Sequence, residues 1–130
     1  MNLAMFLTPL ASVACLPARM TVRLALEEMQ TLGYAAVPVV DADGTYLGTL
    51  TEGDLLRFVR GENDLDASLV LDVPTRTENR AVSVLDGIDS IVERAADQNF
   101  VPVLDSRGVL MGIVTRRTLI QHLWSRAKGA

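Results

Sequence analysis

Thr51 and Asp54 stand three residues apart, where an apolar run gives way to a helical pattern. A threonine at a helix N-cap accepts a hydrogen bond from the backbone N–H three residues on, and an acid there returns a bond, so the pair fits a capping box. The same carboxylate can also accept from both hydroxyls of a ribose, as an acid does in dinucleotide-binding folds. Gly53 leaves the backbone bare where a ligand would approach. The residues leave both interpretations open.

A second stretch, GIVTRRTLIQH at 112–122, follows the template of GTLTEGDLLRF at 48–58. Thr115 takes the place of Thr51, but Thr118 takes the place of the acid. A threonine offers one hydroxyl and cannot accept from two ribose hydroxyls as a carboxylate does. Under the ribose interpretation, the first site is kept as a nucleoside clamp and the second is degenerate.

Arg116 and Arg117 fall in the first turn of the second helix, where a cation opposes the helix dipole. A solvated pair of arginines is one explanation. An anionic ligand is another, because the free N–H groups of a helix N-terminus bind phosphate.

These two joins belong to a longer internal repeat, which aligns 37–58 with 101–122 without a gap. Five residue types return 64 positions apart: Pro38 and Pro102, Asp41 and Asp105, Gly44 and Gly108, Gly48 and Gly112, and Thr51 and Thr115. A repeat of this length indicates one supersecondary unit used twice.

Each copy reads as strand, helix, strand, strand, helix. A β-branched run at 37–40 before Asp-Ala-Asp-Gly predicts a hairpin with a return strand at 46–50, and a helix follows over 52–60. Apolar residues at helical spacing predict an amphipathic helix upstream in each copy, with Asp86 as the N-cap of the second. Short strands are expected at 13–16 and 81–84.

The fold class expected is α/β, with two tandem β-α-β-β-α repeats at 1–61 and 68–128 related by a pseudo-twofold axis. The polar, acidic segment 60–68 is the predicted linker. One copy is too small to bury its sheet alone, so the two should close each other's cores and leave a crevice near the helix starts.

Composition narrows the functional classes. The chain is 49% apolar with a net charge of −4 and a pI near 4.9, which argues against nucleic-acid or anionic-membrane binding. Cys15 is the only cysteine, so no intrachain disulfide forms, and the cytoplasm is the expected compartment. No nucleophile–base set, metal cluster or phosphate loop stands out, and we expect no enzyme.

At these residues the chain resembles the cystathionine-β-synthase (CBS) domain pair. The family's marks are a Pro-Val-Val-Asp strand and a Gly-x-x-Thr/Ser-x-x-Asp join, found here at 38–41 and 48–54 and, without the last acid, at 102–105 and 112–118. The resemblance implies a non-catalytic sensor that binds an adenosine-containing ligand (AMP, ADP, ATP or S-adenosylmethionine) in its crevice. It implies that Asp54 holds the ribose and Thr51 the ribose or phosphate, with Thr115 matching Thr51.

The resemblance also implies that apolar residues near the first strands and before the prolines sandwich the adenine. The corresponding side chains in this sequence are Thr8, Val13, Tyr34 and Ala35 in the first copy and Thr75, Val82, Asn99 and Phe100 in the second. With the two joins, Arg116 included, they complete the set of expected ligand-binding residues.

Two other functions remain open. The pair could serve only as a dimerisation or interaction block, with the join a plain helix cap, or it could sense cyclic di-AMP. The expected partners are a second copy of the chain, bound through a helix face containing Leu119, Leu123 and Trp124, the adenosine ligand, and an effector protein. Neither nucleic acid nor a membrane is an expected partner.

Overall fold

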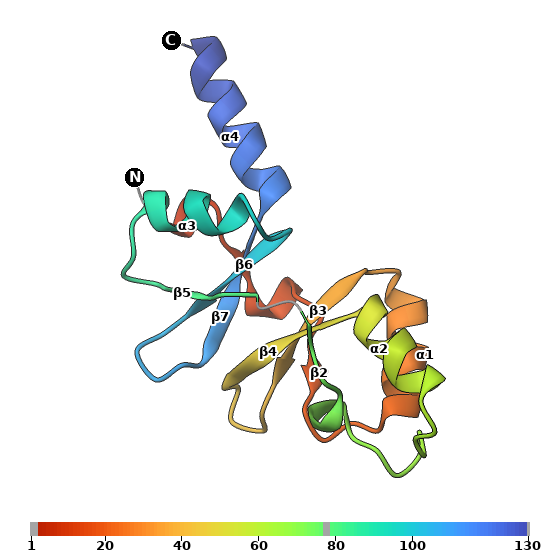
Figure 1. Ribbon diagram of the computed structural model, residues 1–130. Helices are drawn as coiled ribbons and strands as arrows, with labels where there is room; N and C mark the ends of the chain where they lie inside the picture. The colour runs from red at the N-terminus through yellow and green to blue at the C-terminus, as the bar shows by residue number, and fades with distance from the viewer. Residues whose placement is uncertain (1–2, 77–78, 130) are drawn as a thin grey trace. The chain divides into compact units, whose positions relative to one another are not determined.

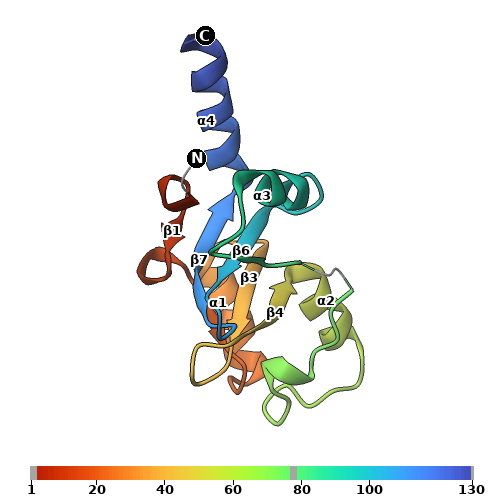
Figure 2. The same ribbon diagram turned by 90° about the vertical axis from the view of Figure 1, so that its left-hand side faces the viewer.

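The computed structural model describes residues 3–76 and 79–129, and they divide into two compact units. The central unit is built from residues 14–76. The terminal unit combines residues 3–13 with residues 79–129. The first thirteen residues therefore pack with the second copy of the repeat and not with the first. Figure 1 labels the four α-helices and the strands β2 to β7, and Figure 2 labels β1.

The central unit is a three-stranded sheet with two helices. Its order is β2-β3-β4, with β2 parallel to β3 and β3 antiparallel to β4. The elements are β2 (Leu16–Pro17), α1 (Val22–Leu32), β3 (Ala36–Val40), β4 (Tyr46–Thr51), α2 (Glu52–Arg60) and the short 3-10 helix η3 (Val70–Asp72). The hairpin turn between β3 and β4 places Gly44 at a φ of 87°, a conformation that glycine adopts without strain.

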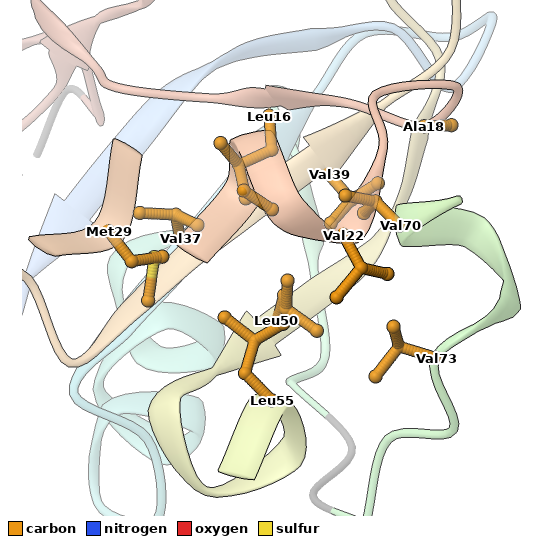
Figure 3. Close-up of a cluster of buried hydrophobic side chains, with 11 residues drawn as sticks. Leu16, Ala18, Val22, Met29, Val37, Val39, Leu50, Leu55, Val70 and Val73 are labelled. Carbon is orange, nitrogen blue, oxygen red and sulfur yellow. The ribbon is translucent and has the colours of Figure 1, made fainter. Parts of the chain in front are cut away.

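The core of the central unit lies between one face of the sheet and the two helices (Figure 3). Val22, Ala25 and Met29 come from one side of α1, as their i, i+3, i+7 spacing requires. Val70 and Val73 complete this core from the segment that follows α2. That segment lies beyond the predicted linker, so the first copy does not close its core with its own residues alone.

The terminal unit repeats this plan and adds one strand. Its sheet order is β1-β7-β6-β5, and its helices are α3 (Ile88–Ala95) and α4 (Arg116–Gly129). The strands are β1 (Thr8–Pro9), β5 (Val82–Ser83), β6 (Phe100–Leu104) and β7 (Leu110–Thr115); η1 (Leu3–Met5) and η2 (Leu10–Ser12) are short 3-10 helices. Figures 1 and 2 both show α4 extending beyond the sheet of this unit.

The N-terminal segment is integral to the terminal unit. Leu3 and Phe6 are buried in its core, and the Phe6 ring meets the ring of His122 edge-on, with centroids 4.6 Å apart. β1 pairs antiparallel with β7, beside which it runs in Figure 2. A Cβ on Gly112 would lie 2.2 Å from the carbonyl oxygen of Thr8, so β1 can approach β7 only because this residue is glycine.

Each copy of the repeat is preceded by the same kind of segment. In both, a 3-10 turn is closed by a backbone bond, from Phe6 N–H to Leu3 O at 3.0 Å and from Val73 N–H to Val70 O at 3.1 Å, and the residue that ends the turn is buried. The segment preceding the first copy packs in the terminal unit, and that preceding the second copy packs in the central unit. Each segment therefore completes a core built mainly by the other copy.

Most expected elements are confirmed, including both hairpins and the 52–60 helix, while the expected N-cap of the second upstream helix is wrong. Gly87, not Asp86, is the N-cap of α3, because the Asp86 carboxylate instead accepts the Ser83 N–H (2.9 Å) and closes the preceding turn. The predicted linker packs against α1, where Val22 N–H donates to Ser68 O at 2.9 Å and Arg23 pairs with Asp66. The predicted early strands are shortened to β2 and β5.

Replacing Gly112 with alanine is expected to destabilise the protein by about 1–3 kcal/mol, because the new methyl group collides with the backbone of β1. Urea denaturation followed by circular dichroism measures the change. Gly87→Ala is the matched control, since nothing lies within 4 Å of its Cβ position and its φ is −81°. Equal stability of the Gly112 variant and the wild type would contradict the close approach of β1 to β7.

Candidate functional site: two strand-to-helix joins

The join of the central unit is a capping box. β4 runs into α2 without a loop, and Thr51 is the N-cap. The Asp54 N–H donates to Thr51 Oγ1 and the Thr51 N–H donates to Asp54 Oδ2, each at 3.1 Å. The structure thus confirms the helix-cap interpretation of this pair, and the carboxylate also lies at the positive end of the α2 dipole.

Asp54 is the most enclosed acid of the described chain, 2% exposed, and protein donors occupy both of its oxygens. Its Oδ1 accepts from the Arg57 guanidinium, one helical turn on, and from the backbone N–H of Arg76 at 3.2 Å. A buried carboxylate is costly unless it is paired and hydrogen-bonded, and these donors meet that requirement. A carboxylate has about four acceptor positions, so one stays open on Oδ2, and a second ribose hydroxyl would have to displace one of these donors.

Gly53 serves this arrangement directly. A Cβ at this position would lie 3.3 Å from Arg57 Nη1, closer than ordinary contacts allow. The absence of a side chain therefore leaves room for the guanidinium to fold back on Asp54. The sequence reasoning missed Arg57, although its i, i+3 spacing from Asp54 was a usable signal, and Arg76 had no local signal at all.

The join of the terminal unit keeps the cap without the charge. The Thr118 N–H donates to Thr115 Oγ1 at 3.2 Å, and the two threonine hydroxyls are 2.9 Å apart. Residue 121, the counterpart of Arg57, is glutamine. An acid at position 118 would therefore lack the guanidinium that compensates Asp54 in the central unit.

Arg116 is engaged with the preceding helix. Its guanidinium donates to the carbonyl oxygens of Ala95 (2.6 Å) and Ala96 (2.9 Å) and to Asn99 Oδ1 (3.3 Å). The carbonyls at the C-terminus of α3 form the negative end of its dipole, which a cation stabilises. This contact offsets the unfavourable position of Arg116 at the start of α4, and it accounts for the arginine without any ligand.

Two of the expected lining residues do reach the joins. Glu52 N–H donates to Ala35 O at 2.9 Å, and Arg116 N–H donates to Asn99 O at 3.0 Å. These are the same backbone bond in the two units, so the 64-residue correspondence extends back to the residues before the prolines. Tyr34 is adjacent and 54% exposed, which leaves its ring available for contact.

The remaining candidates are distributed over both units. Thr75 is exposed in the central unit, next to the residue whose N–H binds Asp54. Thr8 and Val13 belong to the terminal unit with Val82 and Phe100, and the last two are buried. The first-copy group is therefore divided, with Tyr34 and Ala35 in one unit and Thr8 and Val13 in the other.

An apolar groove of about 300 Å³ runs along α3 and α4 of the terminal unit. Its lining is almost wholly apolar, and Arg116 supplies the charge; the lining residues are Val92, Ala95, Ala96, Arg116, Leu119, Ile120 and Leu123. Trp124 follows on α4 and is 65% exposed. The helix face expected from Leu119, Leu123 and Trp124 is thus real, but Leu119 is buried in the core.

Other chemistry has little support in residues 3–76 and 79–129. No three acidic, cysteine or histidine side chains gather there into a set that could hold a metal ion. No helix in this part of the chain is long and apolar enough to cross a bilayer. Burial raises the pKa of the Cys15 thiol, which lowers its thiolate fraction and its reactivity at neutral pH.

Comparison with known proteins gives a consistent result. The family model of the CBS domain matches residues 8–61 and 77–125. A search of curated proteins finds no match. Among solved structures, the CbpB protein of Listeria monocytogenes in complex with c-di-AMP is 24% identical, with 98% of each chain covered and a TM-score of 0.86.

Two further solved structures are similar. A CBS domain protein from Streptococcus pneumoniae is 24% identical over 94% of this chain and 86% of that chain, with a TM-score of 0.85. The CBS-pair protein CBSX2 from Arabidopsis thaliana is 21% identical over 96% and 95%, with a TM-score of 0.77. At these identities the likeness establishes the fold.

Exchanging the two joins tests what the acid contributes to stability. Asp54→Thr is expected to lower the free energy of unfolding by about 1.5–3 kcal/mol, because bonds to a charged group are lost and Arg57 is left without its partner. Thr118→Asp, the reciprocal control, should change the free energy of unfolding by less than about 1 kcal/mol. The new carboxylate interacts favourably with the α4 dipole, but no guanidinium pairs with it as Arg57 pairs with Asp54. Urea denaturation of both variants measures the difference. An unchanged Asp54→Thr variant would mean that the acid is not a structural residue.

Proposed function

Because the chain belongs to the CBS domain family, we propose that it is a regulatory module that binds an adenosine-containing nucleotide at its strand-to-helix joins and performs no catalysis. The observation that carries this proposal is the match over 98% of both chains to CbpB, whose solved structure holds c-di-AMP. Cyclic di-AMP therefore ranks beside AMP, ADP, ATP and S-adenosylmethionine as a ligand.

The two joins supply different groups to such a ligand. Asp54 accepts hydrogen bonds from ribose hydroxyls, and Thr51 contacts the ribose or a phosphate. The terminal join offers the hydroxyls of Thr115 and Thr118 and the exposed Arg117, which attract a phosphate. Tyr34, which lies beside the central join and is exposed, contacts the base. Occupancy is then passed to an effector protein in the cytoplasm.

A second candidate function, a dimerisation module, is favoured by the α3–α4 face. Residues 116–130 carry four basic and no acidic side chains, whereas the rest of the chain has a net charge of −8. Ile120, Leu123 and Trp124 form an apolar stripe on α4, and the basic side chains of this helix lie beside it. On α3 the exposed Asp89 and Glu93 lie beside Val92. In a twofold dimer the basic α4 of each copy can face the acidic side chains on α3 of the other, so the same contact forms twice. The homodimer is compatible with ligand binding.

Titration calorimetry with AMP, ATP and c-di-AMP tests the ligand. We expect binding of one adenine nucleotide per chain to the wild type and a loss of affinity of about tenfold or more in Asp54→Asn, which keeps the size of the side chain but not its charge. Asp72→Asn is the matched control, because Asp72 is an exposed acid that caps η3 through Leu69 N–H.

The outcomes separate the two functions. Undiminished affinity in Asp54→Asn would remove Asp54 from the site. If none of the three nucleotides binds the wild-type protein, the dimerisation module is the remaining function.

Sedimentation equilibrium tests the second copy. The wild type is expected at twice the chain mass of 14.1 kDa, and Leu123→Glu, which puts a charge into the apolar stripe, is expected at the chain mass. Leu85→Glu is the control, since Leu85 is 87% exposed and lies in the turn before α3. A wild-type monomer at micromolar concentration contradicts the homodimer.

A further inference from the structure

Asp54 holds more than the start of α2. The Arg76 N–H that binds its Oδ1 lies 22 residues away, at the end of the segment that completes the central core through Val70 and Val73. We call this bond a clasp, because it holds the backbone at Arg76, the last residue that the structure describes in the central unit.

Gln98 forms the corresponding clasp in the terminal unit. Its side chain accepts the Arg80 N–H at 2.7 Å and donates to the Arg80 carbonyl oxygen at 2.9 Å and to that of Phe100 at 3.0 Å. The residue is 8% exposed. The connection between the two units is thus fixed at Arg76 and at Arg80, each time by a buried polar side chain acting on the backbone.

The two clasps differ in how readily they open. Gln98 binds Arg80 through two bonds and has no other protein donor in the contacts described. Asp54 Oδ1 accepts hydrogen bonds from both Arg57 and Arg76. The bond from the Arg76 N–H to Asp54 is 3.2 Å long, whereas the bond from the Arg80 N–H to Gln98 is 2.7 Å long. The Arg76 side chain is exposed, so water can satisfy its backbone N–H once that bond opens.

We propose that the ligand's ribose hydroxyl displaces the Arg76 N–H from Asp54, so that nucleotide occupancy releases one end of the connection between the units. The inference rests on the proposed function and gives its regulatory step. A hydroxyl bond to a carboxylate is shorter and stronger than a backbone N–H bond to it, which favours the exchange. Arg57 stays paired and keeps the buried carboxylate compensated throughout.

This exchange at Asp54 explains why one copy has an acid at its join and the other a threonine. The terminal unit fixes its N-terminal segment by strand pairing, Thr8 with Ile113, and needs no carboxylate there. The central unit fixes the start of its segment by backbone bonds from Val70 and Leu71 to Met20 and Ala18, and the end of it through Asp54, whose bond a ligand can take over. An acid is therefore required in the copy that responds and not in the other.

NMR-resolved amide hydrogen exchange tests the clasp, with AMP and c-di-AMP as probes. In the free wild type the Arg76 and Arg80 amides are both expected to be protected. A saturating nucleotide should speed exchange at Arg76 about tenfold or more, the factor expected when one bond of ordinary net strength is lost, and leave Arg80 unchanged. Free Asp54→Ala, which has no side-chain acceptor, should already exchange quickly at Arg76, and Asp72→Ala should match the wild type.

The results separate this inference from the function on which it rests. Nucleotide binding that leaves Arg76 protected, or that loosens Arg80 equally, overturns the clasp and leaves the ligand-binding function standing. Equal Arg76 exchange in the free wild type and free Asp54→Ala overturns it as well. Absence of binding by either nucleotide, with Arg76 protected in the free protein, overturns the proposed release and contradicts the ligand, while Asp54 remains a structural clasp.

Discussion

A repeat of about sixty residues has too little interior to bury both its sheet face and its helices, and this constraint governs the rest of the structure. Each unit completes its core with a borrowed segment, meaning the segment that precedes the other copy of the repeat. The 3-10 turn of this segment ends in a buried apolar residue, which is Phe6 in the terminal unit and Val73 in the central unit. Because the segment before the second copy packs with the first, the chain between the copies becomes part of a core and not a free tether.

The borrowed segments explain the polar residues that the units bury. Thr49, Asp54 and Gln98 are the buried polar or charged side chains of the described chain, and two of them bind the backbone of the 76–80 connection. Arg76 and Arg80 lie outside the strands, and these two side chains give their backbone N–H groups acceptors. A capping role and a ligand role for Asp54 are compatible, since the cap uses Oδ2 and the clasp uses Oδ1.

Local patterns in the sequence were sufficient to predict the hairpins, the 52–60 helix and the capping pair Thr51 and Asp54, because each depends on neighbours within a few residues. They failed where two local partners compete for one side chain, and where the partner is distant. Asp86 was predicted to cap α3, but it bonds back to Ser83. The acidic segment after α2 resembles a linker by composition, and only the tertiary contacts to α1 show that it is packed. The exchange of segments leaves no periodic signal, so it could not be predicted.

The ligand site divides along the same line. Both threonines of the joins, Ala35 and Asn99 could be placed by the 64-residue repeat, and Arg57 by its i, i+3 spacing from Asp54, whereas Arg76 appears only through its bond to Asp54. That the ligand lies in a crevice where the copies meet stays a prediction from the sequence. Arg116 was interpreted as an anion contact, and its three neutral acceptors at the end of α3 give it a structural role instead.

The two copies place a charged side chain at opposite ends of a helix dipole. In the central unit a carboxylate lies at the N-terminus of α2, and in the terminal unit a guanidinium lies at the C-terminus of α3; both placements are favourable. The consequence is chemical. The central join presents a carboxylate, which accepts hydrogen bonds and repels anions, while the terminal join presents hydroxyls beside the exposed cation Arg117. The central join is thus suited to hydroxyl donors such as those of a ribose, and the terminal join to negative charge such as that of a phosphate, a difference that identical joins would not have.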